Sequence, residues 1–328
     1  MDIADAVRQG LTSSPRYLPV WFRYDNIGSI LNDKCLTDNK YYYFHKSELD
    51  IIQRYINEMV CHLKFPCSLV DLGSGNSIKT RRFIDVLLKY QDKLKYIPVD
   101  ISRDFLFETS NALSEIYANC LMVQPVAGDY SVGIEEIGKL ADNKLICWFG
   151  GGNQNESRTQ QVSRLLNLSR NISADDRLLI AYDITQNEEE ILNAYLDPTG
   201  LCANLYLNAL HRLNRDFQGN FNIDNFKLDA SFSRDLSVKG SSAVVMRVRS
   251  TCKHEVYIPG LNLTLPLEEG EYINLFEGEG VSHKYTLDQI RGLAEDGQLH
   301  IEKIWTDAGN HVAYVMFSNR TNAKQAAK

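Results

Sequence analysis

The sequence predicts a doubly wound α/β fold over its first two-thirds, followed by a second lobe of mixed α and β structure. Between residues 67 and 183, apolar runs typical of buried strands alternate with helix-length amphipathic segments. The first of these strands ends in a tight glycine turn over residues 71–75. From residue 242 on, β-rich segments separated by turn residues indicate antiparallel strands. The two patterns together indicate a parallel sheet joined to a separate lobe.

The elements of the α/β region follow one another in a regular order. Strands are predicted over residues 67–70, 94–99, 120–126, 144–149 and 177–183, and helices over 79–88, 103–118 and 157–170. Later strands are predicted over 242–250, 254–258, 261–265 and 312–317, with a turn at Pro259-Gly260. This order of elements is typical of βαβ units followed by a β-rich insertion.

We expect two lobes from this order. Residues 60–195, with C-terminal strands within 286–320, form the α/β lobe; residues 1–59 and 196–285 form a second lobe that closes over its crevice; residues 321–328 form a solvated tail. A site between two lobes is a usual place for a small-molecule pocket.

The glycine turn predicts a nucleotide-type ligand. Gly73 and Gly75 let the backbone approach a ligand closely, and the N-terminus of the helix that follows favours a carboxylate or phosphate. A dinucleotide fingerprint needs a third glycine at position 78, which is Ile78 here. Asp100, at the end of the second strand, could accept both hydroxyls of a ribose, or could cap the helix that begins near Ser102. The Asp-x-Gly-x-Gly pattern resembles the first motif of class I S-adenosylmethionine (SAM) methyltransferases.

Composition argues against several other classes of protein. The chain of 328 residues has a net charge of −7 and no basic stripe, which argues against a nucleic-acid partner. No apolar run reaches the length of a membrane span, and acids stand where a signal peptide would be basic, so we expect a cytoplasmic protein with no membrane partner. The seven cysteines are odd in number and form no Cys-x-x-Cys pair, which predicts reduced thiols and no metal site. The oligomeric state is not indicated.

A series of short motifs resembles one family of methyltransferases. In chain order they are Trp21–Asp25 with Gly28-Ser29, Tyr42-Tyr43 with Glu48, Asp71–Gly75 with Lys79–Arg81, Asp100–Ser102, Gly128–Tyr130, Phe149–Gly151 with Asn155, Tyr195–Asp197, Leu213–Arg215 and Trp305–Asp307. Over roughly residues 15–318 the chain resembles the Nα-methyltransferases of free aromatic amino acids, namely the histidine methyltransferase of ergothioneine biosynthesis and its fungal tryptophan-derivative relatives. The resemblance implies a class I SAM-methyltransferase Rossmann-like lobe with a mixed α+β substrate-binding lobe, and methyl transfer from SAM to an α-amine.

The resemblance also implies which residues bind the cofactor. They are Tyr24, Gly73, Gly75, Lys79, Asp100, Asp129 and Tyr130. In these roles Lys79 pairs with the methionine carboxylate of SAM, Asp129 bonds the adenine amino group, and Tyr130 lines the base. Read without the resemblance, Lys79 is a solvated helix lysine and Asp129 is a turn residue.

Substrate-binding residues follow from the same resemblance. Asn155 holds the substrate amine, Tyr195 binds its carboxylate, and Tyr42 or Tyr43 lines the amine pocket. Asn155 and Tyr43 are the candidate catalytic residues. Both tyrosines could instead be buried aromatics, because the aromatic run 41–44 must bury some of its rings.

One departure from the family concerns recognition of the substrate ring. Where the histidine enzymes carry Glu-x-Ser-x-Lys-Phe, this chain keeps Ser282 but has Gly280 in place of the glutamate. Glu277 or Glu279 could take over that role, although a one-residue shift moves a strand side chain to the opposite face. We therefore expect tryptophan or a tryptophan derivative as the favoured free amino-acid substrate, with histidine as the alternative. A non-catalytic SAM-binding regulatory protein is the alternative of another class.

Overall fold

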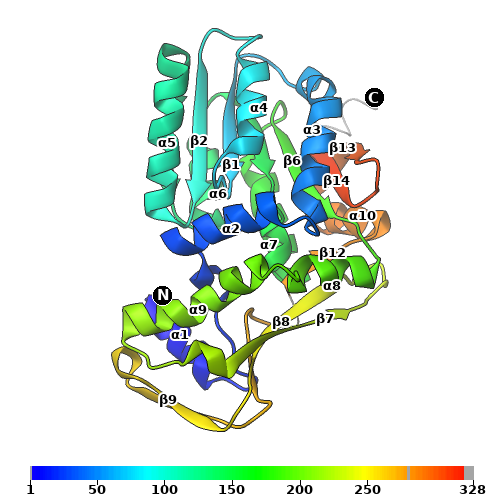
Figure 1. Cartoon of the computed structure of the whole chain (residues 1–328). Coiled ribbons are helices and arrows are strands. Elements are labelled where there is room, and N and C mark those ends of the chain that lie inside the picture. Colours follow the sequence, from blue (N-terminus) through cyan, green and yellow to red (C-terminus); the bar gives the residue numbers. More distant parts are fainter. Residues whose placement is uncertain (1, 279–280, 321–328) are drawn as a thin grey trace. The chain divides into compact units, whose positions relative to one another are not determined.

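The computed structural model describes residues 2–278 and 281–320 and divides the chain into two compact units (Figure 1). Unit 1 is built from Met1–Tyr42, Asn187–Arg234 and Ser242–His283, and unit 2 from Tyr43–Gln186, Asp235–Ser241 and Lys284–Lys328. Each unit is therefore assembled from segments that are far apart in the sequence.

This grouping differs from the expected ranges in three places, each for a packing reason. Helix α3 (Tyr43–Cys61) belongs to unit 2, because it packs on α4 and β14. Helix α8 (Glu188–Leu196) belongs to unit 1, because it packs on β7. Residues 235–241 belong to unit 2, where the Gln289 side-chain amide donates to two of their carbonyl oxygens.

Unit 2 is organised around a mixed sheet, whose strand order in the described residues is β13-β14-β6-β5-β1-β2-β3, with β4 also paired to β2. Strands β1 to β6 pair in parallel, whereas β14 is antiparallel to both β6 and β13. The strands are β1 Cys67–Leu72, β2 Leu94–Asp100, β3 Leu121–Val123, β4 Val126–Ala127, β5 Asn143–Trp148, β6 Arg177–Asp183, β13 Leu299–Thr306 and β14 Val312–Asn319. This is the predicted doubly wound sheet, extended by two antiparallel strands.

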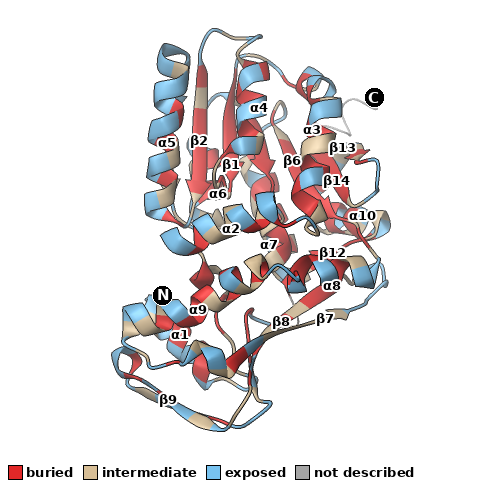
Figure 2. Ribbon diagram, in the orientation of Figure 1, coloured by how far each residue is buried: buried red, intermediate tan, exposed pale blue. Residues whose placement is uncertain are grey.

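Helices cover both faces of this sheet. Successive side chains of each strand point to opposite faces, and apolar residues on both faces need helices to bury them. Val70 and Leu72 join a buried cluster with residues of α6, α7 and α10, whereas Asp71 meets Thr80 of α4 on the other face. In Figure 2 the strands are mostly buried and the outer side of α5 is exposed. The remaining helices are α4 Ile78–Leu87, α5 Arg103–Tyr117, η2 Ala118–Cys120, α6 Tyr130–Lys139, η3 Gly152–Asn155, α7 Arg158–Asn171 and α10 Leu287–Asp296.

One predicted strand is interrupted in the structure and another begins later than expected. The expected strand 120–126 is interrupted between β3 and β4, where Pro125 has no N–H to give to the ladder. In the expected strand 261–265, Leu261 ends the 3-10 turn η5 (Pro259–Leu261), so the strand β10 begins at Leu263. Both differences come from proline.

Unit 1 combines helices with small antiparallel sheets. Strand β8 pairs with β7 and β11 in a sheet that also holds β12, while β9 and β10 form a separate hairpin. Helix α9 packs against α2 and η1. Its elements are α1 Ile3–Thr12, η1 Val20–Arg23, α2 Asn26–Asp38, α9 Leu201–Phe217, η4 Ile223–Asn225, β7 Phe226–Ser233, β8 Ser242–Ser250, β9 His254–Ile258, β10 Leu263–Leu267, β11 Tyr272–Asn274 and β12 Val281–Lys284, whose last residue falls in unit 2.

Candidate functional site

The glycine turn of unit 2 is fixed by hydrogen bonds to the end of β2. Gly73 and Gly75 have φ of +78° and +49°, a left-handed backbone that glycine adopts without strain. The amide nitrogens of Gly73 and Ser74 donate to the Val99 carbonyl at 2.8 and 3.0 Å. The amide of Gly75 donates to Oδ2 of Asp100 at 2.9 Å. The turn and the acid at the next strand end therefore form one structure.

Asp100 keeps accepting capacity beyond these contacts. Its Oδ1 accepts from the Ser102 amide at 2.9 Å, so each carboxylate oxygen holds one backbone N–H and has further lone pairs. Burial raises the pKa of Asp100 above its ordinary value, against the lowering effect of the backbone hydrogen bonds from Ser102 and Gly75. The Asp100 carboxylate therefore bonds the amide of Ser102, the residue before α5, and lies beside the glycine turn.

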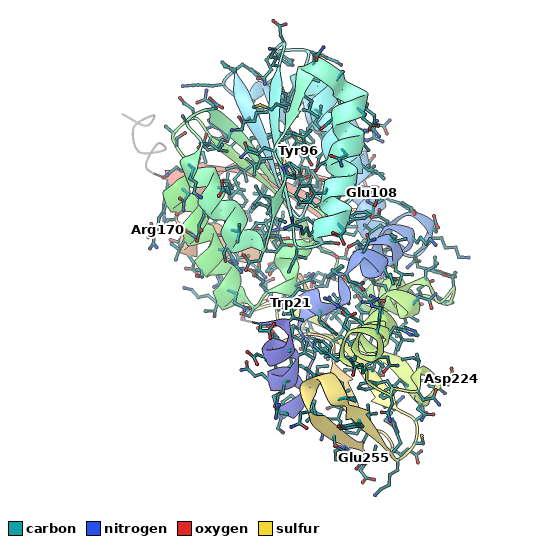
Figure 3. All side chains as sticks on the ribbon, turned by 90° about the vertical axis from the view of Figure 1, so that its left-hand side faces the viewer. Trp21, Tyr96, Glu108, Arg170, Asp224 and Glu255 are labelled. Atoms are coloured by element: carbon teal, nitrogen blue, oxygen red, sulfur yellow. The ribbon has the colours of Figure 1, made fainter. Side chains whose placement is uncertain are left out.

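A second acid, Asp71, lies buried at the end of β1. Its Oδ2 accepts hydrogen bonds from the hydroxyls of Thr80 and Tyr96, the latter at 3.3 Å, whereas its Oδ1 has no hydrogen-bond partner. The Tyr96 hydroxyl also bonds Ser77 at 2.9 Å, and Figure 3 shows Tyr96 within the sheet of unit 2. Desolvation raises the pKa of Asp71 to about 6, although Thr80 and Lys79 lower it. The residue at the start of the glycine turn therefore carries a carboxyl group that loses its proton at a higher pH than usual.

Tyr130 contacts two glycines near the same turn. A Cβ at Gly73 would lie 3.4 Å from the Tyr130 hydroxyl oxygen, and a Cβ at Gly152 would overlap it. The Tyr130 ring packs against Trp148 with centroids 4.7 Å apart. The neighbouring Asp129 is exposed and caps α6, its Oδ1 accepting from the amides of residues 131 and 132. Tyr130 thus lies at the glycine turn and Asp129 caps α6; the predicted contacts of both residues with the adenine of SAM stay predictions.

Lys79 forms an ion pair inside unit 2. Its Nζ lies 2.5 Å from Oε2 of Glu48, whose side chain is fully buried. Oε1 of Glu48 accepts from the Gly150 amide at 2.9 Å and from the Tyr314 hydroxyl at 3.2 Å. Lys79 is therefore not a merely solvated helix lysine. Its contact with the methionine carboxylate of SAM stays a prediction.

Tyr43 is tied to the end of β6 by an acid that sequence reasoning missed. Its hydroxyl donates to Oδ2 of Asp183 at 2.9 Å, and Nζ of Lys284 lies 2.6 Å from the same oxygen. The Lys284 side chain is fully buried. The Tyr43 ring stacks on His311 with centroids 5.0 Å apart. The signal for Asp183 was its place at a strand end, as for Asp71 and Asp100.

Asn155 lies in the turn η3, and its neighbour Gln154 contacts the end of β6. Asn155 closes this turn, which follows Gly150 and Gly151, both with φ of +74°. The side-chain oxygen of the adjacent Gln154 accepts from the Asp183 amide at 2.7 Å. The end of β6 is therefore hydrogen-bonded to Tyr43 and to the residue that precedes Asn155.

Unit 1 brings together three of the predicted substrate residues. The hydroxyls of Tyr195 and Ser282 form a hydrogen bond, and the ring of Tyr42 packs edge-on against Tyr195 with centroids 6.2 Å apart. Gly280 and Glu279 lie outside the described residues, and Glu277 is exposed. The predicted cofactor residue Tyr24 also belongs to unit 1, whereas the other predicted cofactor residues belong to unit 2.

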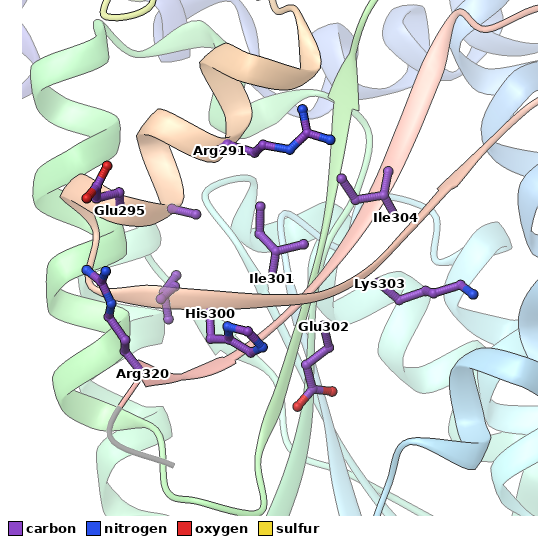
Figure 4. Close-up of a pocket in the computed structure, with 10 residues that line it drawn as sticks. Arg291, Glu295, His300, Ile301, Glu302, Lys303, Ile304 and Arg320 are labelled. Carbon is purple, nitrogen blue, oxygen red and sulfur yellow. The ribbon is translucent and has the colours of Figure 1, made fainter. Parts of the chain in front are cut away.

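Two further observations concern the described residues as a whole. No group of three or more His, Cys, Asp or Glu side chains in residues 2–278 and 281–320 is arranged to hold a metal ion. No helix among them is both long and apolar enough to cross a membrane. A hollow of about 470 Å³ on unit 2 is lined by α10, β13 and Arg320 (Figure 4), and none of the predicted site residues lines it.

Residues 3–319 match the family model described as histidine-specific, SAM-dependent methyltransferases. The chain belongs to this family. The histidine N-alpha-methyltransferase of Mycobacterium tuberculosis is 27% identical over 301 residues, covering 92% of this chain and 90% of that protein. The N-methyltransferase dtpB of Aspergillus flavus is 26% identical over 327 residues, covering 94% and 86%. A solved SAM-dependent methyltransferase from Clostridium acetobutylicum aligns over 90% of this chain and 98% of its own, with 14% identity and a TM-score of 0.45.

The family membership confirms the predicted class of enzyme, a SAM-dependent N-methyltransferase with a class I fold. The glycine turn fits SAM as cofactor. Gly73 and Gly75 leave no side chain in the way of a ligand, and Asp100 retains lone pairs for hydroxyl groups beside them.

Proposed function

We propose that this protein transfers methyl groups from SAM to the α-amine of a free aromatic amino acid, with tryptophan or a tryptophan derivative preferred. The hydrogen bond between Tyr195 and Ser282 carries this proposal. The resemblance assigns Tyr195 to the carboxylate of the substrate and Ser282 to the substrate's ring. Residues that bind these two parts of one small molecule must lie close together. A free amino acid has that size.

The arrangement around Tyr43 suits an amine. When bound, SAM supplies an activated methyl group on its sulfonium. The Tyr43 hydroxyl donates its hydrogen to Asp183, so towards an amine N–H its oxygen would act as an acceptor. Lys284 and the Thr185 amide hold the Asp183 carboxylate in place. Orientation of the amine in this way is a large part of catalysis in a bimolecular transfer.

The ring preference rests on the change at position 280. The family's glutamate gives an imidazole N–H a charged acceptor, and glycine gives it none. The Ser282 hydroxyl already bonds Tyr195. A buried imidazole nitrogen left without a partner costs about 1–3 kcal/mol, whereas burial of a larger apolar ring is favourable.

The test is one amino-acid panel with SAM, read by mass spectrometry and followed by kcat/KM for tryptophan and histidine. We expect tryptophan to exceed histidine by about tenfold or more, in line with the cost of one unpaired polar group. Gly280→Glu should shift the ratio towards histidine, and Glu269→Gln, a change at an exposed acid of unit 1 that has no assigned role, should leave it unchanged. A clear preference of the unmodified enzyme for histidine contradicts the ring assignment. Absence of any methylated amino acid contradicts the whole proposal.

Histidine is the second candidate substrate, and the comparisons favour it. The matched family is described as histidine-specific, and the relative from M. tuberculosis is a histidine N-alpha-methyltransferase. If Glu277 serves as the ring acceptor, Glu277→Gln should lower kcat/KM for histidine and leave tryptophan unaffected.

A further inference from the structure

Unit 1 contains a buried guanidinium that the resemblance does not assign. Arg23, the last residue of η1, is only 4% exposed. Its Nη1 donates to the Leu275 carbonyl at 3.1 Å, and its Nη2 lies 3.4 Å from the Tyr24 hydroxyl. Its guanidinium carbon lies 4.9 Å from the ring centroids of both Tyr24 and Tyr206. Two aromatic rings and two oxygens thus surround a permanent positive charge.

This charge has no acidic partner among the described residues. Arg23 forms no ion pair within residues 2–278 and 281–320, and its buried Nε has no hydrogen-bond partner. A buried charge without a counter-charge is costly, and cation–π contacts of about 0.5–2 kcal/mol offset only part of that cost. Burial lowers the pKa of Arg23, but the hydroxyls of Tyr24, Tyr206 and Tyr195 raise it overall, so the group stays charged. Such a site is suited to an anionic ligand.

The neighbours of Arg23 indicate which anion it binds. Arg23 faces Tyr206 of α9, and α9 packs against α8, which carries Tyr195; the Tyr195 hydroxyl in turn bonds Ser282. The guanidinium therefore lies in the same packed part of unit 1 as the residues that the proposed function assigns to the substrate, and Tyr195 also raises its pKa. Two other arginines of unit 1 have carboxylate partners: Arg212 pairs with Asp216, and Arg215 with Asp25. Arg23 has no such partner among the described residues, although it is almost fully buried.

We propose that Arg23 binds the α-carboxylate of the amino-acid substrate beside Tyr195, and that it makes the enzyme select for a free carboxylate. This inference rests on the proposed function. A guanidinium presents a planar fork of donors that matches a carboxylate, and its unpaired Nε–H and remaining Nη–H groups supply the hydrogen bonds. An amino-acid amide or the decarboxylated amine offers no negative charge to this fork.

The experiment compares three substrates in the unmodified enzyme and in variants: the preferred aromatic amino acid, its carboxamide, and its decarboxylated amine. We expect the unmodified enzyme to favour the free acid by about 100-fold or more in kcat/KM, as for removal of a charge-assisted bidentate pair. In Arg23→Gln, KM for the acid should rise about 10- to 100-fold with little change in kcat, and KM for the amide should not rise. Arg23→Lys keeps the positive charge but loses the planar pair of N–H donors. Its KM for the acid should lie between those of the unmodified enzyme and Arg23→Gln.

Arg212→Gln is the matched control, because Arg212 also stacks on an aromatic ring in unit 1 but has an acidic partner. It should retain the full preference for the acid. SAM affinity is measured by calorimetry in all four proteins, because Arg23 also contacts the predicted cofactor residue Tyr24; a loss of SAM binding through Tyr24 would lower kcat/KM for acid and amide alike. The proposal is overturned if Arg23→Gln lowers kcat/KM equally for the acid and the amide. It is also overturned if the variant binds SAM more weakly but keeps its preference for the acid. Should Arg23→Gln fail to fold, the same comparison in Arg23→Lys decides it. Failure of the proposed function is distinct, because the unmodified enzyme would then methylate no amino acid.

Discussion

The buried carboxyl group of Asp71 should contribute to the stability of this protein at low pH, and this contribution should be lost as the pH rises. The folded state raises the pKa of Asp71 from about 3.8 to about 6, chiefly by desolvation. The folded protein therefore binds this proton more tightly than the unfolded chain does. Between these two pH values unfolding releases the proton, so the contribution of Asp71 to stability is lost as pH rises through that window. The difference of 2.2 units, 6 minus 3.8, corresponds to about 3 kcal/mol at 1.36 kcal/mol per unit.

Asp71→Asn removes this ionisation while keeping the shape of the side chain. The asparagine oxygen can still accept from Thr80 and Tyr96, and the amide nitrogen takes the place of the unpartnered Oδ1. Any cost of the unpaired amide is independent of pH. At pH 4 the unfolded carboxyl is already more than half ionised, so the variant should gain about 2.4 kcal/mol in free energy of unfolding between pH 4 and pH 7, relative to the unmodified protein.

The assay is urea unfolding followed by circular dichroism at several pH values. Asp92→Asn, at an exposed acid of the same unit, is the matched control and should show a much smaller change with pH. If the stability difference between Asp71→Asn and the unmodified protein is the same at pH 4 and pH 7, the reasoning about Asp71 is wrong.

Two predictions concern the cofactor residues. Asp100→Ala should weaken SAM binding by about 3 kcal/mol or more, which is about 100-fold in Kd, because two charge-assisted hydrogen bonds are lost. If a folded variant binds SAM with unchanged affinity in calorimetry, the assignment of Asp100 to the ribose is wrong. Gly152→Ala should also weaken SAM binding, because the new Cβ overlaps the Tyr130 hydroxyl oxygen. Adding Tyr130→Phe should restore part of that loss, since the nearest remaining ring carbon lies 3.3 Å away; no recovery in the double variant would show that the overlap is not the cause.

Local pattern predicted most of the sheet but not its edge. The predicted strands at 67–70, 177–183 and 242–250 correspond to β1, β6 and β8, because each has a continuous or alternating apolar pattern. Strand β13 was not predicted as a strand of its own. Its pairing with β14 shifts register between Ile301 and Lys303, and such a bulge breaks the alternation on which the prediction depends.

The candidate site was predicted less completely, because several of its contacts join distant parts of the chain. Asp183 and Lys284 are about a hundred residues apart, and only folding brings their side chains to 2.6 Å. Glu48 was part of a family motif, yet its partner Lys79 could not be read from spacing. Arg23 was quoted within a motif and given no role, because the absence of an acidic partner is a property of its surroundings. Residue type and order predict which groups are present, whereas the fold decides what each one contacts.

The order of strands in the large sheet has a consequence for synthesis of the chain on the ribosome. Strand β6 pairs with β5 on one side and with β14 on the other. Because β14 ends at Asn319, the second edge of β6 stays open until more than a hundred further residues have been made. An open apolar strand edge invites pairing with other chains. Nascent or truncated chains that lack residues 312–319 should therefore be the aggregation-prone forms, and in cells they are the natural clients of chaperones.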